Sequence, residues 1–268
     1  MRNAFEAGTI ISIIAGITGY FVVLRRSAFV AHAFSEIGFA GAAGAVLLGI
    51  PPIAGLLLGS TLGALAIAAL GRRATNRDTQ IGIVLAFALG LGLLFISLYT
   101  GYASEAYSIL FGEILGISSS AVLLTLIASA GVLIVLGILY RPLLFASLDE
   151  DVAEAKGLPM LFLGTAFLIV VAVAVSFAVQ VTGVLLIFSL MVTPAATAQY
   201  LSRRPQWAII FSVGIALATT WVGLFVAFYT IYPVSFFITG MVFGLYLLVR
   251  AARLVIRPHK VHDPPVVA

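Results

Sequence analysis

The chain has 268 residues, of which 62% are hydrophobic and 9% are charged. Soluble domains are about 45–50% apolar and about 25% charged, so a mean hydropathy of +1.21 excludes a soluble globular domain and a disordered chain. The sequence has no cysteine, which excludes disulfides, thiolate metal sites and cysteine nucleophiles. This composition predicts an integral membrane protein.

Nine apolar segments have the length of about 20 residues that a transmembrane helix needs. Charged or proline-bearing breaks separate them, and their many Gly and Ala residues permit close helix packing in lipid. The alternating segments of a membrane barrel do not occur. The predicted fold is an all-α polytopic membrane bundle with spans at residues 8–24, 28–49, 52–70, 81–100, 120–140, 159–178, 180–201, 206–229 and 234–252.

The 14 Lys and Arg residues are divided unevenly between the two sides of such a bundle. With nine spans, all except Arg2 fall in the loops of one side or at and after the end of the last span on that side. The positive-inside rule places that side in the cytoplasm, with the N-terminus outside and the C-terminus inside. The pI of 9.6 is then explained by topology, without nucleic-acid binding. Arg25 and Arg26 follow the first span directly, a stop-transfer pattern that predicts a retained helix.

No Gly/Ser-rich or Pro-rich linker divides the chain, and no internal repeat is evident. We therefore expect one transmembrane domain over residues 1–254. The polar, proline-bearing residues 255–268 are expected to form a flexible cytoplasmic tail.

One irregular segment, residues 103–118, falls on the predicted outer side. Its apolar run is too short to cross a bilayer and is interrupted by Gly112 and Glu113. Two interpretations stay open: a short re-entrant or interfacial outer helix, and an amphipathic loop on the bilayer surface. Glu113 is accordingly a candidate for the outer entrance of a path, or a surface residue.

A second irregular segment, residues 142–158, falls on the predicted cytoplasmic side. Pro142 is expected to end the preceding helix and Gly157 to end a short helix that Ser147 or Asp149 caps. The acidic residues of its first turn suit the helix dipole. We interpret this helix as a docking element for a soluble partner; the alternative is a solvated loop helix.

The second span contains two ionisable residues, His32 and Glu36, which lie on one face of a helix because they are four residues apart. Ionisable groups at membrane depth are costly and usually mark an ion pathway. An imidazole and a carboxylate are ligands for zinc, manganese or iron(II). The alternative is a structural hydrogen bond between the two side chains.

Signatures of catalysis are missing from the sequence, which has neither a phosphate-binding G-x-x-x-x-G-K-[ST] loop nor an H-E-x-x-H motif. We therefore expect no enzymatic activity in this chain. Pro194, in the seventh predicted span, should kink its helix, and Thr193 and Gly183 are candidates to relieve the freed carbonyls or to line a path. A static packing kink is the alternative.

Four motifs occur in order along the chain: SAFVAHAFSEIGFAG, LFGEILGIS, SLDEDVAEAKGLP and QVTGVLLIFSLMVTPAATAQ. Together they resemble the membrane permease subunit of the bacterial ABC importers for zinc, manganese and iron (ABC-3 type), over about residues 5–250. In the third motif, Asp149, Ala153 and Gly157 match the Asp, Ala and Gly of the family's coupling helix. The family commonly has a carboxylate at position 32 and a histidine at position 36, so the pair is reversed here.

This resemblance implies an ATP-driven importer of a divalent metal in the bacterial cytoplasmic (inner) membrane. An extracytoplasmic metal-binding protein would deliver the metal, and two copies of the chain, a homodimer, would form the path. Separate cytoplasmic ATPase subunits would bind ATP and contact the coupling helix, and no cofactor would be bound permanently. Two other classes stay open from the residues alone: an ion-coupled secondary cation carrier or channel that uses His32 and Glu36, and a membrane scaffold.

Overall fold

The structure is a computed structural model that describes residues 1–70, 77–99, 112, 114–230 and 232–256. These residues form α-helices and no β-strand. Nine of the helices in this part of the chain are long and apolar enough to cross a membrane. The predicted all-α bundle and the number of spans are therefore confirmed.

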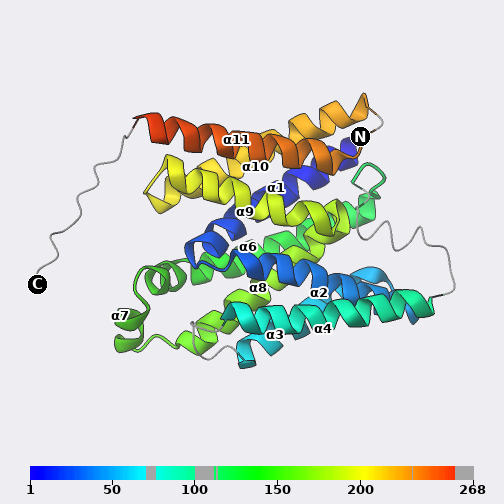
Figure 1. The fold of residues 1–268 in the computed structure, drawn as a ribbon, viewed down its shortest axis with the longest axis horizontal. Helices are drawn as coiled ribbons and strands as arrows, with labels where there is room; N and C mark the ends of the chain where they lie inside the picture. Colours follow the sequence, from blue (N-terminus) through cyan, green and yellow to red (C-terminus); the bar gives the residue numbers. More distant parts are fainter. Residues whose placement is uncertain (71–76, 100–111, 113, 231, 257–268) are drawn as a thin grey trace, which may run out of the picture.

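The long helices run side by side along one axis of the molecule, and successive spans alternate in direction (Figure 1). Their bounds are α1 (Arg2–Leu24), α2 (Ala28–Leu47), α3 (Pro52–Leu70), α4 (Arg77–Leu98), α6 (Ser119–Leu148), α8 (Met160–Thr182), α9 (Val184–Leu201), α10 (Pro205–Phe228) and α11 (Val234–Ile256), with the short α7 (Glu150–Ala155) between α6 and α8.

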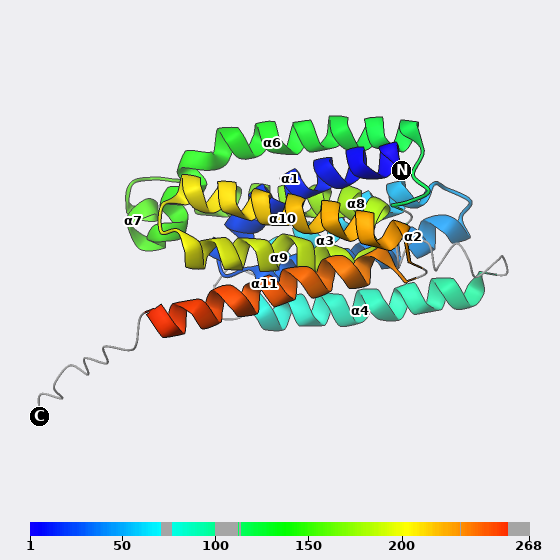
Figure 2. The same ribbon diagram turned by 90° about the horizontal axis from the view of Figure 1, so that it is seen from above.

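The two ends of the bundle differ in the segments that they carry. The N-terminus lies at one end, whereas α7 and the end of α11 lie at the other (Figures 1 and 2). The α1–α2 and α9–α10 connections, which hold Arg25, Arg26, Arg203 and Arg204, share the end that carries α7. The basic loops are thus gathered at one end, while the direction of that end in the cell stays a prediction.

The expectation that Pro142 ends its helix is wrong. Helix α6 begins after Ser118, whose side chain accepts a hydrogen bond from the Ala121 amide (3.3 Å), and it continues through Pro142 to Leu148. A proline within a membrane helix is tolerated when neighbouring groups accommodate the freed backbone. With 30 residues, α6 is about 45 Å long, so it extends beyond a hydrocarbon layer of about 30 Å.

Helix α1 also differs from its predicted bounds, because it begins at Arg2 and not at residue 8. The Arg2 guanidinium lies 2.7 Å from the Glu6 carboxylate, one turn along the helix. Pairs one turn apart support a helix end, and hydropathy alone does not detect them.

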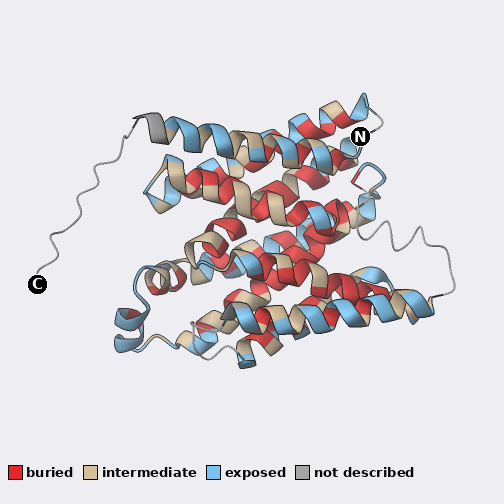
Figure 3. Cartoon of the chain, viewed as in Figure 1, coloured by how far each residue is buried: buried red, intermediate tan, exposed pale blue. Residues whose placement is uncertain are grey.

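The buried residues lie in the middle of the bundle, and the outer faces of α4, α6 and α11 are exposed (Figure 3). Many of these exposed residues are large and apolar, for example Leu93, Ile138 and Leu248. Because lipid covers such faces in a membrane, their exposure is expected. The functional side chains must therefore be sought on the central helices.

Helix α2 crosses α3 at two glycines that bring the backbones into contact. A Cβ atom added to Gly41 would collide with the carbonyl oxygen of Gly55, and one added to Gly55 would collide with that of Gly41. Nearby, the Ser60 hydroxyl of α3 donates to the Phe34 carbonyl of α2 at 3.0 Å. Small residues at the crossing therefore fix the position of α2.

This crossing gives a stability prediction for Gly41→Ala. The added methyl group must push α2 away from α3, at an expected cost of about 1–3 kcal/mol. We expect a lower apparent melting temperature of the detergent-purified protein. The control is Gly90→Ala, where an added Cβ atom meets nothing within 4 Å; equal melting of the two variants would contradict the packing argument.

Candidate translocation path and docking helix

His32 and Glu36 lie on a face of α2 that the described residues cover only in part. Between residues 30 and 40 every residue is buried except these two, which are half-buried. Helices α3, α4, α8 and α9 pack around the other faces of α2. The structure thus brings the predicted pair together on one open face, in the middle of a buried helix.

The imidazole of His32 contacts two aromatic rings. Its ring centroid lies 5.9 Å from that of Phe29, one turn away on α2, and 5.3 Å from that of Phe188 on α9. Within the described part of the chain, neither a hydrogen bond nor an ion pair joins His32 to Glu36. The hydrogen bond of the structural interpretation is therefore not formed between these two side chains.

A single copy of the chain supplies few metal ligands. Over the described ranges, no group of three or more His, Cys, Asp or Glu side chains could hold a metal ion. Zinc sites usually have four ligands, and three of them come from protein even in open sites. Among the described residues, His32 and Glu36 thus do not make up the ligand set of a metal site by themselves.

Two hydroxyl hydrogen bonds join α3 to its neighbours α2 and α8. Ser176 of α8 donates to the Leu56 carbonyl of α3 at 3.1 Å, and Ser60 joins α3 to α2 as described above. All three residues are buried. Helix α2, with its His32 and Glu36 pair, is therefore supported by α3 and, through α3, by α8.

Thr193 and Pro194 lie in the middle of α9, which continues without interruption through Pro194. The carbonyl of Thr193 accepts a hydrogen bond from the Thr197 hydroxyl at 2.7 Å. Pro194 is buried and Thr193 is half-buried. A helical proline at this point is confirmed, whereas a path role for either residue stays a prediction.

Gly183 does not lie beside Pro194 but forms the whole connection between α8 and α9. Its φ of 80° and ψ of 166° belong to a region that is essentially restricted to glycine. Gly112 of the outer segment also has a positive φ, 74°, and a Cβ atom there would collide with the backbone of Thr182 and Gly183. Gly112 is therefore packed directly onto the α8–α9 turn.

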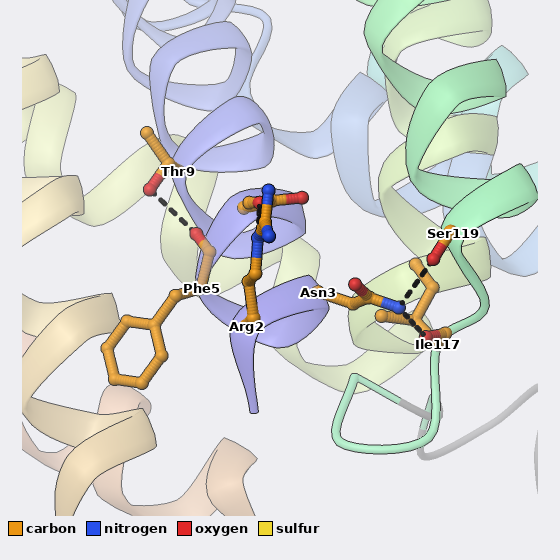
Figure 4. A network of polar contacts seen from close by, with 7 residues as sticks. Arg2, Asn3, Phe5, Thr9, Ile117 and Ser119 are labelled. Carbon is orange, nitrogen blue, oxygen red and sulfur yellow. Dashed lines mark hydrogen bonds and ion pairs between the residues drawn. The ribbon is translucent and has the colours of Figure 1, made fainter.

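The residues that lead into α6 are hydrogen-bonded to the N-terminal end of α1. The Asn3 side chain donates to the Ile117 carbonyl at 3.1 Å and to the Ser119 hydroxyl at 3.2 Å (Figure 4). This contact anchors the start of α6 to α1. Glu113, the predicted residue at the outer entrance, lies outside the described residues, as does most of the segment 103–118.

At the opposite end, α7 is the predicted short helix. Its cap is Asp149, whose carboxylate accepts a hydrogen bond from the Val152 amide at 3.0 Å, whereas Ser147 belongs to α6. Gly157 has a φ of 81°. The Leu158 amide donates to the Ala153 carbonyl and the Gly157 amide to that of Glu154, which together form a Schellman motif.

The two faces of α7 differ in what they contact. Ala153 is fully buried, so its methyl group packs inside this chain. Val152 and Leu148 are 43% and 71% exposed beside the acidic residues of the first turn. Sequence reasoning had not selected these two apolar residues, because their exposure depends on how α6 and α7 meet.

These features define a class of protein: a multi-pass membrane protein with two ionisable residues on a central helix and a short acidic helix at one end of the bundle. Residues 1–253 match the ABC 3 transport family, ABC-3. The chain therefore belongs to the ABC-3 transport family, as its motifs had predicted.

Relatives and solved structures extend this assignment. The chain is 28% identical over 236 residues to the manganese transport system membrane protein MntC of Halalkalibacterium halodurans, over 88% of this chain and 80% of that one. It is 30% identical over 231 residues to the chelated iron transport system membrane protein YfeC of Yersinia pestis, over 85% and 78%. The structure of PsaBC from Streptococcus pneumoniae in complex with Fab matches with a TM-score of 0.83 and 26% identity, over 97% and 93%.

The α8–α9 turn gives a second prediction, for Gly183→Ala. An alanine in this backbone conformation costs roughly 1–3 kcal/mol, so we expect a lower melting temperature of the purified protein. Gly164→Ala on α8 is the matched control, because its Cβ atom meets nothing within 4 Å. The glycine requirement is refuted if both variants melt with the wild type.

Proposed function

We propose that this chain is the permease subunit of an ATP-driven importer for a divalent transition metal. The observation that carries the proposal is the half-buried His32 and Glu36 pair on the uncovered face of α2. The named relatives of the chain belong to manganese and chelated iron transport systems, and the chemistry of the pair fits such metals.

A homodimer would complete the site. Rotation about a two-fold axis beside the open face of α2 would bring a second imidazole and a second carboxylate to the first pair. Four ligands, two nitrogen and two oxygen donors, satisfy the coordination number that one chain leaves unfilled. Thr193 and Pro194 of α9 are proposed to line the same path, since α9 also carries Phe188, which contacts His32.

Helix α7 is proposed to couple this path to a separate ATPase subunit that binds ATP. Asp149 and Gly157 fix the two ends of α7, and buried Ala153 fixes it to the bundle. Val152 and Leu148 then present an apolar contact rimmed by carboxylates. A closing movement of the ATPase would reach the bundle through α6, with which α7 is almost continuous.

The proposed orientation follows from the distribution of charge. With α7 and the basic loops in the cytoplasm, the chain would lie in the bacterial inner membrane with its N-terminus outside. The outer end, where Gly112 meets the α8–α9 turn, would then face an extracytoplasmic metal-binding protein. Glu113 is proposed as an outer entrance residue.

The competing proposal is a secondary cation carrier or channel that works without an ATPase. It would use the same pair as a proton or cation site, but it leaves exposed Leu148 of α6 and Val152 of α7 without a function. Copurification with an ATPase subunit distinguishes the two proposals.

The decisive experiment measures ATP hydrolysis by this chain reconstituted with its ATPase and binding protein, across zinc, manganese and iron(II). We expect stimulation by one metal, and at least a tenfold higher metal requirement in His32→Ala and in Glu36→Ala, because loss of even indirect ligand support costs about 10–100-fold.

The matched control exchanges the two groups, His32→Asp together with Glu36→His. This variant keeps one imidazole and one carboxylate on the same face, so it should retain more metal stimulation than either alanine variant. Folded alanine variants with wild-type metal dependence would remove the pair from the path.

Gly157→Trp tests the coupling role. The left-handed backbone alone costs a non-glycine residue about 1–2 kcal/mol, and the indole would also occupy the open space beside α7. We expect normal membrane insertion but loss of metal-stimulated hydrolysis. Gly157→Asn, which tolerates this conformation, should keep the stimulation; wild-type coupling in Gly157→Trp would contradict a docking surface at α7.

A further inference from the structure

Two arginines and two tyrosines form a cluster where α9 and α11 end, at the same end of the bundle as α7 (Figures 1 and 2). The Arg253 guanidinium lies over the ring of Tyr200, 5.6 Å from its centroid. Arg250 donates to the Tyr246 hydroxyl at 3.4 Å, and the two tyrosine rings are 6.0 Å apart. We call these four residues the α9–α11 basic patch.

Helices α8 to α11, as the structure describes them, offer no carboxylate to compensate the charge of this patch. The sequence has no Asp or Glu between Glu154 and Asp263, so helices α8 to α11 contain no carboxylate. Arg203 and Arg204 follow α9 directly and add two more exposed positive charges to this end of the bundle. The acidic α7 lies beyond α6 and α8, on the other side of the same end (Figure 1).

The depth of the patch in a membrane follows from the length of α11. Arg250 and Arg253 come 16 and 19 residues after Val234, which is about 24 and 29 Å along the helix axis. The hydrocarbon layer is about 30 Å thick. The guanidinium groups therefore lie at the level of the lipid headgroups, where tyrosines with one polar end are also enriched.

We propose that the α9–α11 basic patch binds the phosphate of an anionic phospholipid, such as phosphatidylglycerol. A guanidinium group donates two parallel hydrogen bonds to a phosphate. The Tyr200 ring restricts the Arg253 guanidinium by a cation–π contact, which lowers the entropy cost of binding a phosphate. Anionic lipids of the cytoplasmic leaflet attract such clusters.

The site needs a membrane-spanning α11 but no transport activity, so it goes beyond the proposed function. Only the choice of leaflet rests on the proposed orientation. An acidic surface of the ATPase subunit is the competing partner. The structure favours lipid, because the arginines lie within the length of a spanning helix, whereas α7 lies beyond the spans.

The experiment uses the full chain in vesicles of phosphatidylethanolamine with a minority of phosphatidylglycerol. After mild detergent extraction, mass spectrometry measures the ratio of the two lipids that stay bound to the protein. We expect enrichment of phosphatidylglycerol, and about fivefold less of it in Arg253→Gln and Arg250→Gln, since one such charge contributes about 1 kcal/mol.

Two further variants distinguish a specific phosphate-binding site from non-specific electrostatic attraction of anionic lipid. Arg253→Lys keeps the charge but loses the planar fork, so its enrichment should fall between those of the wild type and Arg253→Gln. Arg141→Gln removes an exposed charge from α6 and should leave the enrichment unchanged. The proposal would be overturned if Arg141→Gln lost as much phosphatidylglycerol enrichment as the patch variants, or if Arg250→Gln and Arg253→Gln lost none. It would also be overturned if Arg250→Gln and Arg253→Gln lost copurification with the ATPase but kept the bound phosphatidylglycerol.

Discussion

The close contact of α2 with α3 at Gly41 and Gly55 is the constraint on which the rest of the structure depends. Lipid provides no hydrophobic drive for helix association, so the bundle is held by backbone approach and by buried hydroxyl contacts. Glycines at this crossing and the Ser60 contact to Phe34 leave α2 buried on three sides. A costly pair of ionisable residues is therefore presented at one defined place on an open face.

The two ends of the bundle are built by different means. At the N-terminal end, Gly112 and Gly183 pack backbone on backbone, and Asn3 joins α1 to the start of α6. At the other end, α6 extends past the hydrocarbon layer and carries α7, which is capped at Asp149 and closed at Gly157. A rigid end facing one partner and a projecting helix facing another suit a protein that transmits movement between them.

Charge is also separated within the end that carries α7. Acidic residues are collected on α7, while α8 to α11 contain no carboxylate at all. The arrangement lets one surface attract a protein groove and another attract anionic lipid, with little interference because charges are screened beyond about 10 Å. The proposed coupling and lipid sites can thus operate in the same protein.

Much was determined by the sequence itself, because the relevant physics is local. Hydropathy over about 20 residues specifies a span, a spacing of four places His32 and Glu36 on one face, and Asp149 and Gly157 have the preferences of helix ends. Tertiary structure decided the rest, since it depends on contacts between distant segments. In the folded chain, α6 continues through Pro142 and Ala153 is buried. Phe188 contacts His32, and the Arg253 guanidinium lies over the Tyr200 ring. None of these contacts has a signal in the neighbouring sequence.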